Sequence, residues 1–160
     1  MTNYADYATW LADGRWIRIS ARALIFNAAG DRILIERNVG AQNEHVNFIG
    51  GGVEVGETLQ ECIARELAEE TDAKIVHARY LLLLENFWSH DGEVRHSLEH
   101  YFEIGLDREE ITPRYDNVEF IWTPIAALEG IDLRPAIVRN RIVDGTFREV
   151  GHLVAGNKDA

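Results

Sequence analysis

The sequence lacks the long apolar runs and cysteine pairs that mark several classes of protein. No apolar run approaches the ~18 residues of a membrane-spanning helix, and the densest, 80–84, is followed at once by Glu85. The one cysteine, Cys62, can form neither an intramolecular disulfide nor a cysteine-based zinc site by itself. The first ten residues hold no Lys or Arg and no apolar core, so the sequence predicts no secretory signal. We therefore expect a cytoplasmic protein that does not contact membranes.

Basic residues are also scarce, since 16 Lys and Arg stand against 27 Asp and Glu and give a net charge of −11. Binding to nucleic acid depends on clustered Lys and Arg that neutralise phosphates, so the sequence predicts no nucleic-acid partner. A small phosphorylated ligand is still compatible with this charge, because a bound divalent cation can invert its sign locally. With 160 residues, 46% of them apolar and 27% charged, the chain is typical of one soluble globular domain.

The order of apolar and polar stretches predicts an α+β fold with a β-sheet flanked by helices. The clearest helix, 58–71, begins with Thr58 and Glu61 in a capping-box pattern, and an apolar residue recurs every four positions from Leu59. Further helices are expected over 123–128 and 134–145, and strands over 15–26, 32–37, 46–49, 75–87, 95–106 and 118–122. Strands therefore dominate, and the helices are interspersed among them.

A glycine-rich segment, 50–52, leads into a helix that is crowded with carboxylates. At about 100° per residue, Glu66, Glu69 and Glu70 fall within an arc of roughly 100°. Like charges four residues apart repel, and negative charge in the last turn opposes the helix dipole. A compensating cation would remove both penalties, and hard oxygen ligands suit Mg²⁺ or Mn²⁺. The alternative is a solvated acidic face, and the carboxylates alone do not decide between the two.

The spacing of this segment resembles the Nudix box, whose pattern is G-x(5)-E-x(7)-R-E-U-x-E-E-x-G-U, with U a bulky apolar residue. The fixed positions are matched by Gly51, Glu57, Arg65, Glu66, Glu69 and Glu70. Six such matches arise by chance in a chain of this composition with a probability on the order of 10⁻⁴. Asp72 and Ala73 depart from the last glycine and apolar positions of the pattern. The resemblance implies one Nudix-like domain over 1–160, with its core at about 15–145, built as an α/β/α sandwich with a mixed sheet.

The resemblance also implies an activity. Nudix hydrolases use a divalent metal, here Mg²⁺ or Mn²⁺, and a metal-activated water to cleave a pyrophosphate bond. The substrate would be a nucleoside diphosphate linked to another moiety, or a nucleoside triphosphate. The alternative is a catalytically silent Nudix domain that acts as a nucleotide-binding sensor.

Carried onto this sequence, the family's pattern implies a set of site residues. The metal ligands would be the backbone carbonyl of Gly50 with Glu66, Glu69 and Glu70, while Glu57 would brace the loop or bind the metal through water. Glu69 is the first candidate for the general base and Glu119 the second. Arg65 would orient the carboxylates, and its alternative role is an ordinary surface ion pair.

Substrate contacts are less well defined by the sequence. Arg22 and Arg37 lie on predicted strands that would face the pocket and hold phosphates, although each is also typical of a surface arginine. Phe48 would stack on a base, although aromatic residues on strands more often belong to the core. Ser89 stands where ADP-ribose-specific members have a proline, which argues against that substrate. The particular substrate, the number of metal ions and the oligomeric state stay open, with a homodimer among the alternatives.

Overall fold

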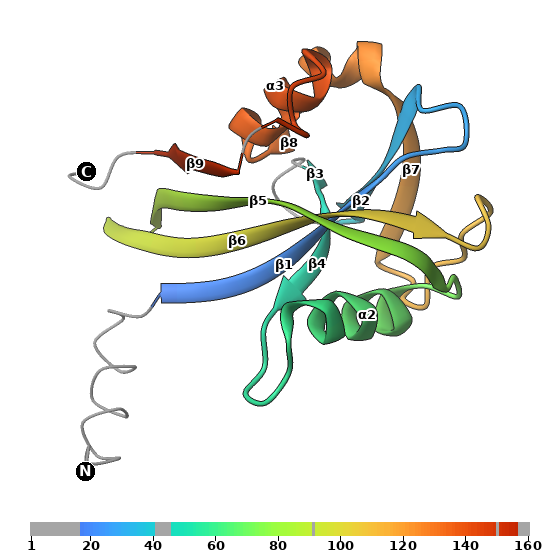
Figure 1. Cartoon of the computed structure of the whole chain (residues 1–160), viewed down its shortest axis with the longest axis horizontal. Coiled ribbons are helices and arrows are strands. Elements are labelled where there is room, and N and C mark those ends of the chain that lie inside the picture. The colour runs from blue at the N-terminus through green and yellow to red at the C-terminus, as the bar shows by residue number, and fades with distance from the viewer. Residues whose placement is uncertain (1–16, 41–45, 91, 150, 157–160) are drawn as a thin grey trace.

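The computed structural model describes residues 17–40, 46–90, 92–149 and 151–156, and it shows a mixed β-sheet structure flanked by helices (Figure 1). The strands are β1 (Ile17–Ile25), β2 (Arg32–Asn38), β3 (Val46–Asn47), β4 (Ile49–Gly52), β5 (Ile75–His90), β6 (Glu93–Leu106), β7 (Val118–Pro124), β8 (Leu133–Arg134) and β9 (His152–Ala155). The helices are α2 (Leu59–Glu70), α3 (Ala136–Val143) and the 3₁₀ helix η1 (Ile125–Gly130). This confirms the predicted α+β class.

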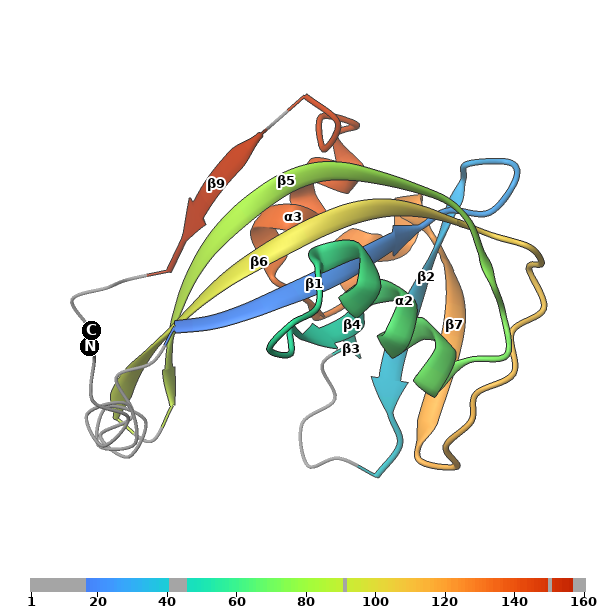
Figure 2. The same cartoon turned by 60° about the horizontal axis from the view of Figure 1, so that its bottom comes forward.

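Two sheets organise these elements. One has the strand order β4-β1-β6-β5-β9, and the other has the order β7-β2-β3-β8. β1 runs parallel to β6, whereas β5 and β6 form a long antiparallel pair. The long strands β1, β5 and β6 arch side by side, with α2 on one side of them and α3 on the other (Figures 1 and 2). The helices therefore form the two outer layers expected of an α/β/α sandwich.

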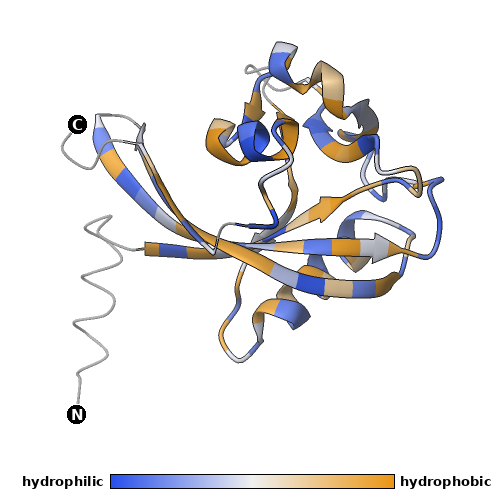
Figure 3. Cartoon of the chain, turned by 45° about the horizontal axis from the view of Figure 1, so that its top comes forward, coloured by the Kyte–Doolittle hydropathy of each residue, from blue (hydrophilic) through white to orange (hydrophobic). Residues whose placement is uncertain are grey.

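The core is divided between the two faces of the long sheet, because successive side chains of a strand point to opposite faces. On β1, Ala23 and Ile25 pack in the cluster under α2, whereas Leu24 packs in the cluster on the α3 side. Hydrophobic and hydrophilic bands follow one another along the long strands (Figure 3). No helix among the described residues is long and apolar enough to cross a membrane.

The helix predicted over 58–71 is confirmed as α2, together with its capping box. The Thr58 hydroxyl accepts the Glu61 N–H at 3.2 Å, and the Glu61 carboxylate accepts the Thr58 N–H at 2.7 Å. Ile63 and Leu67 are buried on the face of α2 that packs against the sheet. The carboxylates of the Nudix-box pattern, Glu66, Glu69 and Glu70, lie on α2 beside this buried face.

Two features differ from the sequence-based expectation. The stretch predicted as one strand over 46–49 is divided, because β3 joins the smaller sheet and β4, with its glycines, joins the larger one. Beyond the core expected at about 15–145, β9 pairs in parallel with β5, and Phe147 and Leu153 are buried in the α3-side cluster. A strand of four residues is too short for its periodicity to stand out in the sequence.

Candidate active site

The glycine segment is held directly against α2. β4 pairs with the middle of β1, with Arg22 opposite Gly50 and Ala21 opposite Gly51. At Gly50 the backbone has φ +132°, and an added Cβ would lie 2.2 Å from the Ala21 carbonyl oxygen. At Gly51 an added Cβ would lie 2.0 Å from a carboxylate oxygen of Glu66. The absence of a side chain at Gly50 therefore lets β4 lie close to β1, and its absence at Gly51 lets the Glu66 carboxylate lie against the loop backbone.

Arg65 connects the carboxylates of α2 with the loop that precedes it. Its guanidinium donates to Glu57 at 2.8 and 3.1 Å, to Glu66 at 2.9 Å and to the Gly52 carbonyl at 3.0 Å. A longer contact of 3.5 Å reaches Glu69, whose side chain is half exposed. Arg65 therefore fixes Glu57 and Glu66, and it leaves most of the Glu69 carboxylate open to solvent.

Glu57 is held in its ionised form. Its carboxylate accepts two hydrogen bonds from Arg65 and one from the Glu54 N–H at 2.6 Å. These donors, with Arg65 first, lower the pKa of Glu57 from 4.5 to about 2. The same bonds join the loop between Gly52 and α2 to the helix.

Glu70, unlike Glu57, lies in surroundings that disfavour its ionised form. Its Oε2 atom is buried and has no hydrogen-bond partner among the residues that the structure describes. Burial, and then the nearby carboxylates of Glu36 and Glu66, raise the pKa of Glu70 from 4.5 to about 8. Within the described part of the chain this oxygen therefore has no hydrogen-bond donor, and the positive charge of Arg22 offsets the rise in the pKa only in part.

Glu36 forms a carboxylate cluster with Glu66 and Glu70. The sequence interpretation missed it. It lies on β2 with 9% of its surface exposed, and burial raises its pKa. Its carboxylate accepts a long hydrogen bond of 3.4 Å from the Asn38 side chain. The signal in the sequence is a carboxylate directly after the apolar run Ile33–Ile35, but this run alone does not say that the carboxylate faces α2.

The donor set of this cluster suits a hard divalent cation. It offers carboxylates and a backbone carbonyl, and the unpartnered oxygen of Glu70 would gain a ligand bond. Within the described ranges, however, no three Asp, Glu, His or Cys side chains are arranged as a ready-made cage for a metal. This is compatible with Mg²⁺, which keeps several waters and shares its coordination with substrate phosphates.

The remaining predicted site residues lie in three different environments. Arg22 lies at the cluster and donates to the Gly50 carbonyl at 2.7 Å. Arg37 and Glu119 face each other on β2 and β7 and form an ion pair of 2.6 Å, in which each side chain is about half exposed (48% and 47%). Phe48 is buried to 1% exposure and packs edge-to-face on Tyr101, so its ring contributes to the core rather than to a ligand surface.

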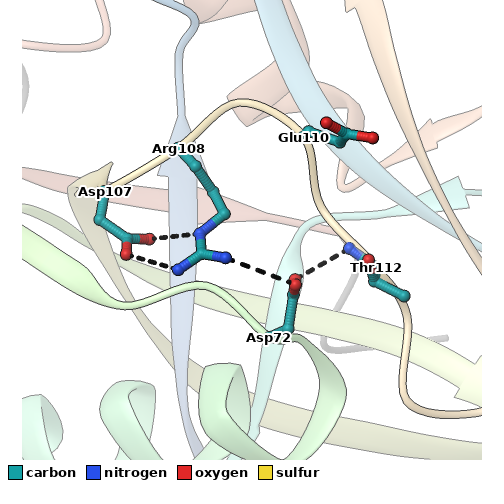
Figure 4. A pocket seen from close by; sticks show the side chains of 5 residues that line it. All are labelled: Asp72, Asp107, Arg108, Glu110 and Thr112. Carbon is teal, nitrogen blue, oxygen red and sulfur yellow. Dashed lines mark hydrogen bonds and ion pairs between the residues drawn. The ribbon is translucent and has the colours of Figure 1, made fainter.

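A separate pocket of about 420 Å³ lies beyond the C-terminal end of α2 (Figure 4). Its lining residues are Asp72, Asp107, Arg108, Glu110 and Thr112. Asp72, which replaces the last glycine of the pattern, accepts the Thr112 N–H at 2.9 Å and lies 3.7 Å from the Arg108 guanidinium. Arg108 also pairs with Asp107 at 2.9 Å. These contacts tie the loop after β6 to the end of α2, which is a structural role.

The raised pKa of Glu70 predicts how the metal-free protein responds to pH. The folded state keeps a proton up to about pH 8, whereas the unfolded state releases it near 4.5. The stability that this proton contributes is therefore full below pH 4.5 and is lost as the pH rises to 8. We expect Glu70→Gln to flatten this part of the profile of melting temperature against pH in EDTA. An unchanged slope in the variant would contradict the assignment.

Comparisons with known proteins show to which family the chain belongs. The family model of the NUDIX domain matches residues 16–142. The NAD-capped RNA hydrolase NudC of Photobacterium profundum is 28% identical over 129 residues, which cover 80% of this chain and 46% of that protein. The chain therefore belongs to the Nudix family. It spans about half the length of the curated relatives that it matches.

Solved structures share the fold. A MutT structure, from work on the Aliivibrio salmonicida and Vibrio cholerae proteins, has a TM-score of 0.65 at 20% identity and covers 81% of this chain and 99% of that chain. The NUDIX domain of Shewanella oneidensis NrtR, solved with ADP ribose, has a TM-score of 0.62 at 17% identity, with 90% and 96% covered. At these identities the likeness establishes the architecture and not the ligand.

Proposed function

We propose that this chain is a Nudix pyrophosphohydrolase that depends on Mg²⁺ or Mn²⁺. Its substrate would be a nucleoside diphosphate linked to another moiety, or a nucleoside triphosphate. The observation that carries the proposal is the buried, unpartnered oxygen of Glu70, which lies among carboxylates on the helix that follows the glycine segment. Membership of the Nudix family supports pyrophosphate hydrolysis as the general chemistry.

The proposal gives each residue of the site a task. Glu66, Glu69, Glu70 and the Gly50 carbonyl would hold the cation, which, when bound, lowers the pKa of a water and neutralises phosphoryl charge. Arg65 keeps the Glu66 carboxylate oriented through its 2.9 Å bond. Glu69 is the first candidate for the general base because its half-exposed carboxylate can receive a proton. Glu119 is the second, although it must first leave its ion pair with Arg37.

Two observations bear on the substrate class. The curated relatives are named for NAD-capped RNA, and NAD is itself a nucleoside diphosphate linked to another moiety. The net charge of −11 favours a small nucleotide over an RNA chain. Arg22 and Arg37 are the candidates for contacts to the substrate's phosphates. A cytoplasmic location, the lack of a nucleic-acid partner and a homodimer stay predictions.

The test is a turnover assay with a panel of substrates. The full chain would be incubated with Mg²⁺ or Mn²⁺ and with NAD, ADP-ribose, nucleotide sugars, nucleoside triphosphates and an NAD-capped oligonucleotide, and the products would be separated by chromatography. We expect cleavage at a pyrophosphate bond, its loss in EDTA, and a decrease of at least ~10²-fold in Glu69→Gln. Glu129→Gln, which changes an exposed carboxylate on η1, is the matched control. Nucleotide binding without turnover under either metal would instead indicate a sensor.

A further inference from the structure

Arg22 makes a contact that the general reaction scheme does not require. Its Nη1 atom donates to the Gly50 carbonyl at 2.7 Å and to the Phe48 carbonyl at 3.3 Å. Both acceptors lie on the segment that leads into the glycines, and Arg22 is the β1 residue paired with Gly50. The Gly50 carbonyl is the backbone oxygen that the proposed function assigns to the metal. The guanidinium is therefore bonded to an oxygen that a divalent cation would also use.

The charge of the same guanidinium also acts on two buried carboxylates of the site. Its positive charge partly offsets the rise in the pKa of Glu36, on β2, and of Glu70, on α2. Arg65 is engaged on the other side of the cluster with Glu57 and Glu66. Arg22 is thus a cation whose charge acts on both of these buried acids.

The Arg22 guanidinium and a divalent cation would compete for the Gly50 carbonyl oxygen. A carbonyl oxygen has two lone pairs, but a cation bound about 2.1 Å from the oxygen would lie within about 5 Å of the guanidinium donor. At that separation the two positive charges repel each other, and the surrounding carboxylates offset part of this repulsion. The hydrogen bond from Arg22 and the metal bond at the same oxygen are therefore expected to exclude each other.

We propose that Arg22 is the built-in counter-ion of the metal-free site and must leave the Gly50 carbonyl before that oxygen can bind a divalent cation. This inference rests on the proposed function, because it takes the metal position from there. Once released, the guanidinium stays at the edge of the site, where a substrate phosphate would give it a new partner. Arg22 would thereby couple loading of the metal to binding of the substrate.

The decisive measurement is the affinity for Mn²⁺ without nucleotide. Free Mn²⁺ would be followed by electron paramagnetic resonance during titration of the full chain. We expect Arg22→Gln to bind Mn²⁺ about tenfold more tightly than the unmodified protein, because the competing charge-assisted hydrogen bond is gone. Arg18→Gln is the matched control, since it removes the same charge from the exposed end of β1, and its affinity is expected to stay within about twofold. Equal or weaker binding by Arg22→Gln would overturn the inference.

Two further readouts separate this role from a merely structural one. Arg22→Gln should lower the Mg²⁺ concentration needed for half-maximal activity while it raises the KM for the nucleotide, whereas simple damage to the site would raise both. If Arg22→Gln does not fold, the side-chain nitrogen resonances of arginine in the unmodified protein report on the same step. They would be assigned with Arg22→Lys, and no change at Arg22 on saturation with Mg²⁺ would overturn the inference.

The two proposals fail in different ways. If the unmodified protein binds Mn²⁺, and Glu70→Gln weakens that binding, the metal site stands and only the comparison with Arg22→Gln decides the role of Arg22. If Mn²⁺ does not bind, or if Glu66→Gln and Glu70→Gln leave its affinity unchanged, the metal site itself is wrong and the inference falls with it.

Discussion

Glu66→Gln and Glu70→Gln are each expected to lower pyrophosphate hydrolysis by at least ~10²-fold while the protein stays folded. The reason is chemical, because an amide keeps the size of the side chain and loses the negative charge that a divalent cation needs. Glu70 also has a buried oxygen without a donor, so its carboxylate contributes little to the stability of the metal-free fold. The expected loss is therefore one of metal binding and catalysis.

The comparison of activity with stability makes this prediction testable. We would measure kcat/KM at saturating Mg²⁺ and melting temperature in EDTA for both variants, with Glu129→Gln as the exposed control. Glu70→Gln should melt at or above the temperature of the unmodified protein at pH 8, because repulsion by Glu36 and Glu66 is removed. Full activity in both variants would contradict the metal assignment.

Gly51→Ala is expected to reduce activity by about 10- to 100-fold with only a small loss of stability. The new methyl group would lie 2.0 Å from an oxygen of the Glu66 carboxylate, so that carboxylate must move. It is the end of a flexible side chain and can move without disturbing the backbone. Because the proposed ligand position would then be lost, metal affinity and activity should fall together.

Gly50→Ala is the matched comparison. There the methyl group would meet the Ala21 backbone oxygen at 2.2 Å, and the φ of +132° is strained for any residue with a Cβ. We expect this variant to lose stability in thermal unfolding, unlike Gly51→Ala. Full activity in Gly51→Ala would show that the position of Glu66 is not required. Equal destabilisation of the two variants would show that Gly51, like Gly50, is required for folding rather than for the position of Glu66.

Local patterns were sufficient for the main elements of the fold. The helix over 58–71 could be predicted because its capping box and its apolar spacing are set within a few residues. The division of 46–52 between two sheets could not be predicted, since strand pairing depends on residues far away in the sequence. The burial of Phe48 against Tyr101 is a similar case, because the ring faces a partner 53 positions later in the chain.

The sequence by itself determined which carboxylates stand together on α2, because the spacing from Gly51 to Glu70 is a property of one continuous segment. Only the tertiary structure decided which groups meet them. Glu36 reaches the cluster from β2, and Arg22 reaches the Gly50 carbonyl from β1. The physical reason is that burial and electrostatic neighbours arise when strands distant in the sequence pack against one helix, and no local pattern specifies that packing.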